Sequence, residues 1–417
     1  CRIPEGFYER LAAHCHAPGI RDLDEALFPW NRAVLAAVDR RPVFLALEGA
    51  FHGRTCGAVQ LTHDPEYRHP YLALGFPVVF LPPGDAPALR RAIEEQSFEY
   101  LELDISLGDE LELRMRAFSN IAALFVEPVQ AEGGVRPLDP VYASVIRQCA
   151  DRVRFPVVAD EIQCGMGRTG EFLASRAVGL KPDYVVFAGA LGGGLAKIAA
   201  LAVARRRYLP EFGRLHASLF SEDEPSCRIA LKAVEIVTRD DGAVMEQCRE
   251  KGRRFLEKLR SLRDKWPTVL REVRGLGLLV GVEFHPQPKT SSRLLSTLSK
   301  QELLGHVLAG WLLHEAAIRV GRTLSHPFTL RVEPSAYVTL ADLDRFVEAL
   351  DRLCEILKKA NMHELVKHMV GLAAPGARGR VLDFSQIRPL AEAPRFAKRV
   401  AFLGHFASPE HMALWAP

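Results

Sequence analysis

The sequence PVVADEIQCGMGRTG, residues 156–170, starts with a short apolar run and continues into an acidic, glycine-rich segment. A short apolar run of this kind is typical of a strand that is buried on both faces of a sheet. Similar runs alternate with helical patterns such as Pro140–Val153; the other runs are Val43–Leu47, Val78–Leu81, Ala122–Val126, Tyr184–Phe187 and Ala200–Val203. This alternation predicts an α/β fold with a mostly parallel sheet flanked by helices. Ligands bind beyond the carboxyl ends of such strands, which is where Asp160 lies.

The composition limits the kinds of partner. The chain has 417 residues, 48% hydrophobic and 25% charged, which is enough for a large domain and a smaller one. The formal net charge is only +3 and the longest run of basic residues is Arg205–Arg207, so we expect no nucleic acid and no membrane as partner. The 8 cysteines show neither a C-x-x-C pair nor a metal-ligand spacing. They predict reduced thiols, a cytoplasmic location and no metal site.

The chain divides into two predicted domains and a tail. The large domain spans residues 1–265 and ends with a long helical pattern at Ser226–Arg263. The smaller α/β domain spans residues 266–372 and opens with a strand at Gly275–Phe284. Its last helix has one apolar face, formed by Leu343, Phe346, Val347, Leu350, Leu353, Cys354 and Leu357. Residues 373–417 are expected to form a linker and tail toward a further domain.

Four segments carry a family resemblance: EGAFHGRT at residues 48–55, EPVQAEGGV at 127–135, DEIQCGMGRTG at 160–170, and KPD at 181–183 followed by LGGG. In order and spacing they resemble the motifs of class III pyridoxal-phosphate (PLP)-dependent aminotransferases, of the ornithine, acetylornithine and omega-amino-acid type. The resemblance covers about residues 40–360. It implies PLP-dependent transferase fold type I, PLP as cofactor, and a homodimer with the active-site cleft at the interface.

The resemblance also implies roles for individual residues. Asp160 would keep the pyridine nitrogen of PLP protonated, so that the ring can accept electrons. Phe51 would stack on that ring, next to His52 of the same motif, and Gln163 would hydrogen-bond the phenolic oxygen. These four are the predicted cofactor-binding residues. The predicted substrate-binding residues are Glu132 and Arg331, since a guanidinium suits a substrate carboxylate.

Three positions depart from the family pattern. Gly189 occupies the place of the lysine that forms the Schiff base with PLP, and Lys197 lies eight residues beyond it, where a solvent or interface role is expected. No Ser-Gly turn for the cofactor phosphate occurs in Arg21–Ala37. Leu219 stands where the partner subunit of the family offers a threonine to the phosphate.

These departures favour a degenerate domain without transamination activity, acting as a structural or interaction module of a larger biosynthetic protein. A first alternative is an active PLP-dependent aminotransferase on an amine or amino acid, which requires a lysine at position 189 in the native protein. A second is a pocket reused for lysine-independent chemistry, in which His52, Asp160, Glu127 and Glu132 supply acid–base groups.

Overall fold

The computed structural model describes residues 3–37, 41–105, 110–215, 223–287 and 292–371. Residues 1–365 form one compact unit, and residues 366–417 belong to a second. The segment around Leu219 and the predicted tail 373–417 lie outside the described residues.

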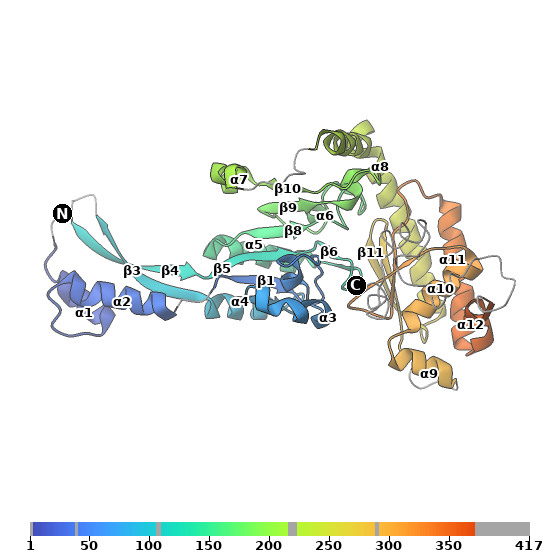
Figure 1. The fold of residues 1–417 in the computed structure, drawn as a ribbon, viewed down its shortest axis with the longest axis horizontal. Coiled ribbons are helices and arrows are strands. Elements are labelled where there is room, and N and C mark those ends of the chain that lie inside the picture. The colour runs from blue at the N-terminus through green and yellow to red at the C-terminus, as the bar shows by residue number, and fades with distance from the viewer. Residues whose placement is uncertain (1–2, 38–40, 106–109, 216–222, 288–291, 372–417) are drawn as a thin grey trace, which may run out of the picture. The chain divides into compact units, whose positions relative to one another are not determined.

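A six-stranded sheet forms the centre of the first unit (Figure 1). Its strand order is β10 (Ala200–Val203), β9 (Tyr184–Phe187), β8 (Val157–Asp160), β5 (Ile121–Val126), β1 (Val43–Leu47) and β2 (Val78–Leu81). All neighbours are parallel except β10, which runs antiparallel to β9. The predicted α/β class, with a mostly parallel sheet, is confirmed.

Helices α4 (Ala86–Glu95) and α5 (Pro140–Val153) share one hydrophobic core with this sheet, in which Leu45, Leu124 and Ile146 are fully buried. Local sequence sets the ends of α5. The Asp139 carboxylate accepts a hydrogen bond from the Tyr142 N–H at the start, and Arg154 adopts a left-handed conformation after the last turn.

A second layer, here called the N-terminal layer, consists of α1 (Phe7–Cys15), α2 (Leu23–Ala37) and the antiparallel hairpin of β3 (Ser97–Ile105) and β4 (Leu111–Ser119). It has its own core, whose buried members are Phe7, Leu11, Ile20, Ala26, Leu27 and Leu101. The hairpin was not predicted. The region Arg21–Ala37, considered for the phosphate turn, is mostly the helix α2 and packs on β3.

A four-stranded antiparallel sheet follows along the chain, in the order β11 (Leu270–Leu276), β12 (Leu279–Phe284), β14 (Thr329–Val332) and β13 (Gly321–Arg322). The prediction of a single strand at Gly275–Phe284 is wrong. The chain reverses at Gly277, which has a φ of 55°, so this apolar stretch forms the end of β11, a turn and β12.

The helix α8 (Glu224–Lys265) includes the predicted helical stretch, but it is broken at Arg239–Gly242, where the backbone is not helical. Its second half lies against the turn of the β11–β12 hairpin. A Cβ atom at Gly252 would come within 2.1 Å of the Gly277 carbonyl oxygen, so only glycine allows this close approach.

The longer helices not yet described are α9 (Arg293–Lys300), α10 (Leu304–Ala316), α11 (Leu340–Lys358) and α12 (Met362–Gly371). The predicted apolar face is the buried face of α11. The prediction that this is the last helix of residues 266–372 is wrong, because α12 follows it. The short elements are η1 (Ala58–Leu61), α3 (Pro65–Arg68), η2 (His69–Leu74), β6 (Val129–Gln130), β7 (Arg136–Pro137), α6 (Ala174–Ala177), η3 (Gly189–Gly192), η4 (Arg205–Arg207) and α7 (Pro210–Leu215). Among the described residues, no helix combines the length and the hydropathy needed to cross a membrane.

Candidate active site

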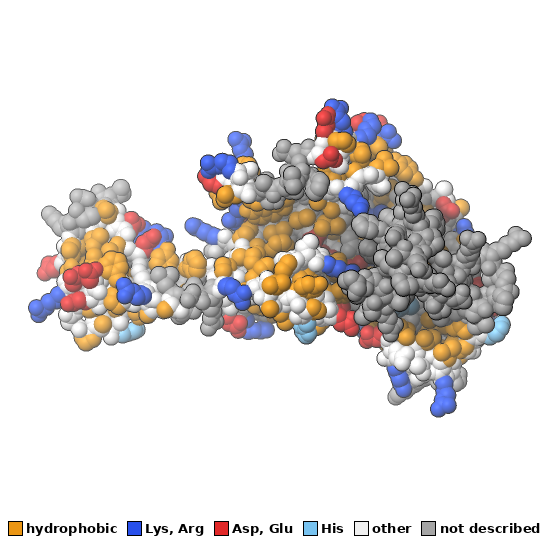
Figure 2. Space-filling view, in the orientation of Figure 1, with side chains coloured by type: hydrophobic (Ala, Val, Ile, Leu, Met, Phe, Trp, Pro, Cys, Tyr) orange, Lys and Arg blue, Asp and Glu red, His pale blue; other side chains and the backbone are white. Residues whose placement is uncertain are grey.

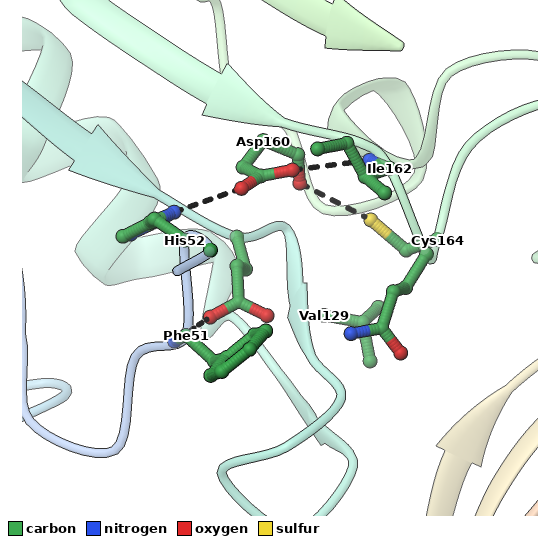
Figure 3. Close-up of a pocket in the computed structure, with 9 residues that line it drawn as sticks. Phe51, His52, Val129, Asp160, Ile162 and Cys164 are labelled. Atoms are coloured by element: carbon green, nitrogen blue, oxygen red, sulfur yellow. Dashed lines mark hydrogen bonds and ion pairs between the residues drawn. The ribbon is translucent and has the colours of Figure 1, made fainter. Parts of the chain in front are cut away.

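A pocket lies at the carboxyl ends of three neighbouring strands (Figure 3). Phe51 and His52 follow β1, Glu127 follows β5, and Asp160 ends β8. The pocket has a volume of about 150 Å³ and is lined by Phe51, His52, Gly53, Glu127, Val129, Asp160, Ile162, Gln163 and Cys164. A cavity of this order holds one benzene-sized ring. The structure therefore brings together the four residues that the sequence assigned to the cofactor.

His52 and Asp160 form a buried pair. Nδ1 of His52 lies 2.9 Å from Oδ2 of Asp160, and the other Asp160 oxygen accepts the Ile162 N–H at 3.1 Å. Burial lowers the pKa of His52, but the hydrogen bond and charge of Asp160, with the charge of Glu127, outweigh it and raise that pKa. The second ring nitrogen, Nε2, is buried without a hydrogen-bond partner among the described residues. The His52–Asp160 pair therefore uses Nδ1 of the imidazole and leaves Nε2 without a partner in this part of the chain.

Glu127 is a second buried acid in the pocket wall. Its oxygens accept the N–H of Phe51 at 3.0 Å and the N–H of Ala131 at 3.3 Å, which joins the loop after β1 to the loop after β5. Burial raises the pKa of Glu127 to about 7; His52 lowers it and Asp160 raises it further. Glu127 therefore exchanges its proton near neutral pH.

Aromatic and apolar groups complete the pocket. The ring of Phe51 meets the ring of Tyr67 edge-on at 6.3 Å, and the guanidinium of Arg54 lies 4.6 Å from the centre of the Tyr67 ring. Gln163 lines the pocket. Trp30, which could have filled this space, packs instead in the N-terminal layer. The pocket is therefore open to a ligand of one ring.

The two predicted substrate-binding residues contact each other. Arg331 of β14 forms an ion pair with Glu132 and a second one with Glu333. The other Glu132 oxygen accepts the Leu324 N–H at 3.0 Å. Neither Arg331 nor Glu132 is among the nine pocket-lining residues. Arg331, which the sequence assigned to a substrate carboxylate, is thus already paired with two carboxylates of the chain.

Gly189 begins η3, separated from the end of β9 by one residue, and its φ is 57°. A Cβ atom added there would lie 3.6 Å from the carbonyl oxygen of Ile162, which lines the pocket. The position thus adjoins the pocket and has room for a side chain. Lys197, in contrast, is exposed and is not a lining residue.

The pocket residues fit only one part of PLP. Asp160, Phe51 and Gln163 could hold a pyridine ring through its nitrogen, face and phenolic oxygen. None of the nine lining residues is Lys, Arg, Ser or Thr, so within the described chain the pocket wall offers no amine for the aldehyde and no cation or hydroxyl for the phosphate. The residues present therefore do not fit the complete cofactor.

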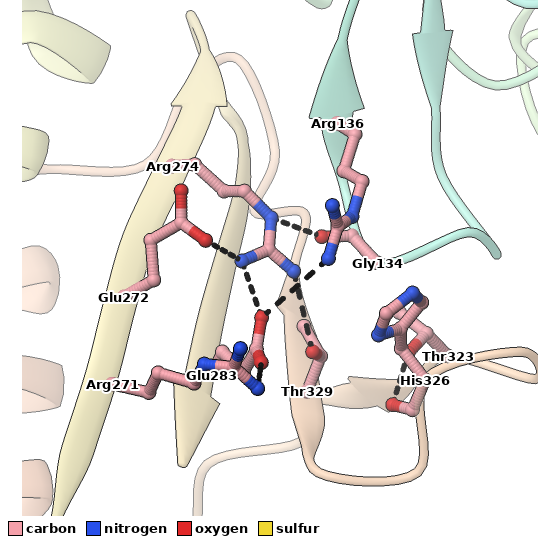
Figure 4. A network of polar contacts seen from close by, with 9 residues as sticks. All are labelled: Gly134, Arg136, Arg271, Glu272, Arg274, Glu283, Thr323, His326 and Thr329. Carbon is pink, nitrogen blue, oxygen red and sulfur yellow. Dashed lines mark hydrogen bonds and ion pairs between the residues drawn. The ribbon is translucent and has the colours of Figure 1, made fainter. Parts of the chain in front are cut away.

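A buried ion network fixes the loop that carries Glu132 (Figure 4). Arg274 of β11 donates from Nε to the Gly134 carbonyl at 2.7 Å, and its Nη1 lies 2.5 Å from a Glu283 oxygen. Arg271 lies 3.1 Å from the other Glu283 oxygen. Burial raises the pKa of Glu283, but the hydrogen bond and charge of Arg274 outweigh it and lower that pKa. The network therefore ties the loop after β5 to the four-stranded sheet.

A largely parallel sheet covered by helices, with an aspartate at the end of a central strand and a pocket beside it, is the arrangement found in PLP-dependent transferase fold type I. Solved structures share this fold: ornithine aminotransferase from Toxoplasma gondii has a TM-score of 0.61 and 20% identity over 79% of this chain and 69% of its own. A structure described as a transaminase with L-ala has a TM-score of 0.63 and 23% identity over 79% of this chain and 76% of its own.

The chain belongs to the class III aminotransferase family, whose model matches residues 27–353. It is 31% identical over 323 residues to the putrescine aminotransferase of Pectobacterium atrosepticum, covering 76% of this chain. The chain spans 60% of the length of that relative. Members of this family use PLP.

Sequence reasoning missed some groups around the pocket. Thr62 accepts the His52 N–H at 3.2 Å and donates to the Gly53 carbonyl at 3.0 Å. Thr62 and Tyr67 lie outside all four family-like segments, so no signal in the sequence pointed to them. Among the described residues, no group of three or more His, Cys, Asp or Glu side chains could hold a metal ion.

Proposed function

We propose that this chain keeps the class III aminotransferase fold without catalysing transamination, and serves as a binding or interaction module of a larger biosynthetic protein. The observation that carries the proposal is that residue 189, beside the pocket, is a glycine. From the order and spacing of the family-like segments, we assign this position to the lysine of the family. A transaminase needs that amine to bind the aldehyde of PLP and then to move a proton between carbon atoms. The uncharged hydrogen of glycine can do neither.

The rest of the site supports the same proposal. The pocket wall lacks phosphate-binding side chains, and Arg331 is neutralised by Glu132 and Glu333. The proposal also includes two domains, residues 1–265 and residues 266–372, followed by a tail that leads to a further domain. It includes a cytoplasmic location as well. The homodimer, which would cover exposed apolar side chains, is also part of the proposal.

Trapping with borohydride tests the proposal. The full chain is incubated with PLP, its visible absorbance is recorded, and sodium borohydride reduces any Schiff base before peptide mapping. We expect no site-specific adduct, because no lysine lines the pocket. A stoichiometric adduct on one lysine of this chain, with the matching absorbance band, would overturn the proposal.

Restoring the amine gives the reciprocal test. Gly189→Lys should yield a trapped adduct at residue 189, because the position adjoins the pocket and Asp160 is still present to hold the ring. A lysine in the left-handed backbone conformation of residue 189 should lower the free energy of unfolding by about 1 to 2 kcal/mol. Gly194→Lys is the matched control, since Gly194 is also left-handed, with a φ of 78°, and has no atoms within 4 Å of an added Cβ. If PLP labelled Gly189→Lys and Gly194→Lys equally, the adduct would come from reaction of an exposed lysine and not from binding in the pocket.

A second candidate function is lysine-independent acid–base chemistry in the same pocket. The observation that favours it is the pKa of Glu127, raised to about 7 by burial. A general acid or base is most effective when its pKa is near the working pH. A thermal-shift screen of metabolites against the wild type and Asp160→Asn tests it. Failure of Asp160→Asn to weaken any binding would count against this candidate.

A further inference from the structure

One buried carboxylate fixes the backbone of the aromatic side of the pocket (Figure 3). Glu127 follows β5, and one of its oxygens accepts the Phe51 N–H from the loop after β1 at 3.0 Å. The other oxygen accepts the Ala131 N–H at 3.3 Å, within the loop after β5 itself. Phe51 and Glu127 both line the pocket, and Glu127 is only 5% exposed. Glu127 therefore sets the position of the Phe51 backbone relative to the turn at Ala131.

A second hydrogen bond between the same two loops is of a different kind. The side-chain amide of Gln130 donates to the Glu48 carbonyl at 3.0 Å. Neither an amide nor a carbonyl gains or loses a proton at working pH, so this bond is the same in acid and in alkaline solution. The bonds of Glu127 can change with its protonation while the Gln130 bond keeps the loops together.

The charged and titratable groups that face Glu127 come from two other segments. His52 follows β1, Asp160 ends β8 and Cys164 lies in the loop after β8; all three line the pocket. Burial raises the pKa of Glu127 to about 7, while the charge of His52 lowers it and that of Asp160 raises it further. Burial also raises the pKa of Cys164, which is therefore a neutral thiol. Glu127 thus changes its charge near neutral pH.

Proton uptake changes what Glu127 can accept. An ionised carboxylate has two acceptor oxygens, whereas the neutral acid has one carbonyl oxygen and a hydroxyl group that is itself a donor. Against burial, which raises the pKa of Glu127, the bonds from Phe51 and Ala131 lower it. Because such coupling is reciprocal, protonation must weaken both bonds. The Ala131 bond is the longer of the two, so its oxygen is the better site for the proton.

We propose that Glu127 is the positioning residue of the pocket: its ionised carboxylate holds the Phe51 backbone and the turn at Ala131 together, and proton uptake by that carboxylate loosens both. The pocket wall is then ordered for a ligand in alkaline solution and loosened in acid. This inference rests on the proposed function, in which the pocket is kept for binding.

Hydrogen exchange of single amides in the full chain tests it, measured by mass spectrometry with electron-transfer fragmentation and corrected for the intrinsic rate at each pH. Between about pH 8.5 and about pH 5.5, protection should fall about tenfold at Ala131 and about threefold at Phe51, whose acceptor loses only its charge. The Leu124 N–H is bound to the Pro156 carbonyl at 3.0 Å. This acceptor cannot titrate, so protection of Leu124 should stay constant.

Two variants separate this role from a purely structural one. Glu127→Gln keeps one acceptor oxygen and has no proton to lose, so protection at Ala131 should be low and independent of pH. Glu161 is the matched control, since it is also buried and its oxygens accept two backbone N–H groups, those of Ala174 and Ser175. Glu161→Gln should keep the wild-type pH profile at Ala131.

Two results would overturn the inference: a wild-type ratio of Ala131 to Leu124 protection that does not change with pH, or a pH profile that persists in Glu127→Gln. Thermal unfolding shows whether Glu127→Gln is folded, and the wild-type profile decides alone if it is not. PLP takes no part in the measurement. A Schiff base with PLP would refute the proposed function and leave the exchange profile unchanged, so the two failures are distinguishable.

Discussion

Glu127 is the residue whose environment changes its chemistry most clearly. It is buried, its two oxygens accept backbone N–H groups, and its neighbours include His52, Asp160 and Cys164 from other loops. Its pKa rises from 4.5 to about 7. Between these pH values the folded chain keeps a proton that the unfolded chain has lost, so the Glu127 contribution to stability is largest at low pH and declines as pH rises.

Glu127→Gln should remove this pH dependence. The difference in unfolding free energy between wild type and variant should shift in favour of the variant from pH 5 to pH 7 and then level off, because Gln has no proton to lose. Urea denaturation at a series of pH values measures the difference. The variant also loses one acceptor for a backbone N–H, which should add a constant cost of about 1 to 3 kcal/mol. If the unfolding free energies of wild type and variant differed by the same amount at every pH from 5 to 7, the pKa of Glu127 would not be raised.

At the residue scale, family-like motifs predicted where Asp160, Phe51, His52 and Gln163 meet, because each lies at or beyond the carboxyl end of a strand, and these ends share one edge of the sheet. The pairing of Arg331 with Glu132 could not be found in this way. It depends on a side-chain contact between residues far apart in sequence.

At the scale of elements, the parallel strands were predictable because they are continuous apolar runs. The β3–β4 hairpin was missed because one face is charged: Glu102 pairs with Arg116, and Asp104 with Arg114. Its other face is covered by α1 and α2, which come much earlier in the chain. The β11–β12 turn was missed because the residues on both sides of it are apolar, so that the end of β11 and all of β12 look like one continuous strand in the sequence.

Asn31 joins α2 to the hairpin. Its side-chain amide donates to the Leu101 carbonyl at 2.8 Å and accepts the Leu101 N–H at 2.9 Å. Asn31→Leu leaves both backbone groups without partners and should destabilise the N-terminal layer by about 2 to 4 kcal/mol. Denaturant unfolding measures the loss, and Arg32→Ala at an exposed neighbouring position is the control. A change of less than about 0.5 kcal/mol would show that water replaces the amide.

At the scale of the whole molecule, one side of the six-stranded sheet exposes apolar side chains. They come from the edge strand β10, from α7 and the residue before it, and from the first half of α8, and include Leu201, Leu209, Phe212, Leu215 and Leu231. Hydrophobic side chains gather over α8 and beside β9 on the face that Figure 2 shows. An exposed apolar surface beside an open strand edge favours association. This surface suits the proposed homodimer.

Light scattering of the full chain should therefore give about twice 46.3 kDa. Leu231→Glu should shift the mass to that of a monomer, because a carboxylate would have to be buried at the interface. Val141→Glu, at an equally exposed position on α5, should remain dimeric. A monomeric wild type, or equal behaviour of both variants, would place the association surface elsewhere.

The separate hydrophobic core of the N-terminal layer has a consequence for how the molecule loses its native order. Segments with a core of their own can open as a unit at a lower free energy than the whole chain. The N-terminal layer buries few large side chains, whereas the central sheet and its helices bury many. Limited proteolysis should therefore nick the layer first, and the protein left behind should keep an intact pocket.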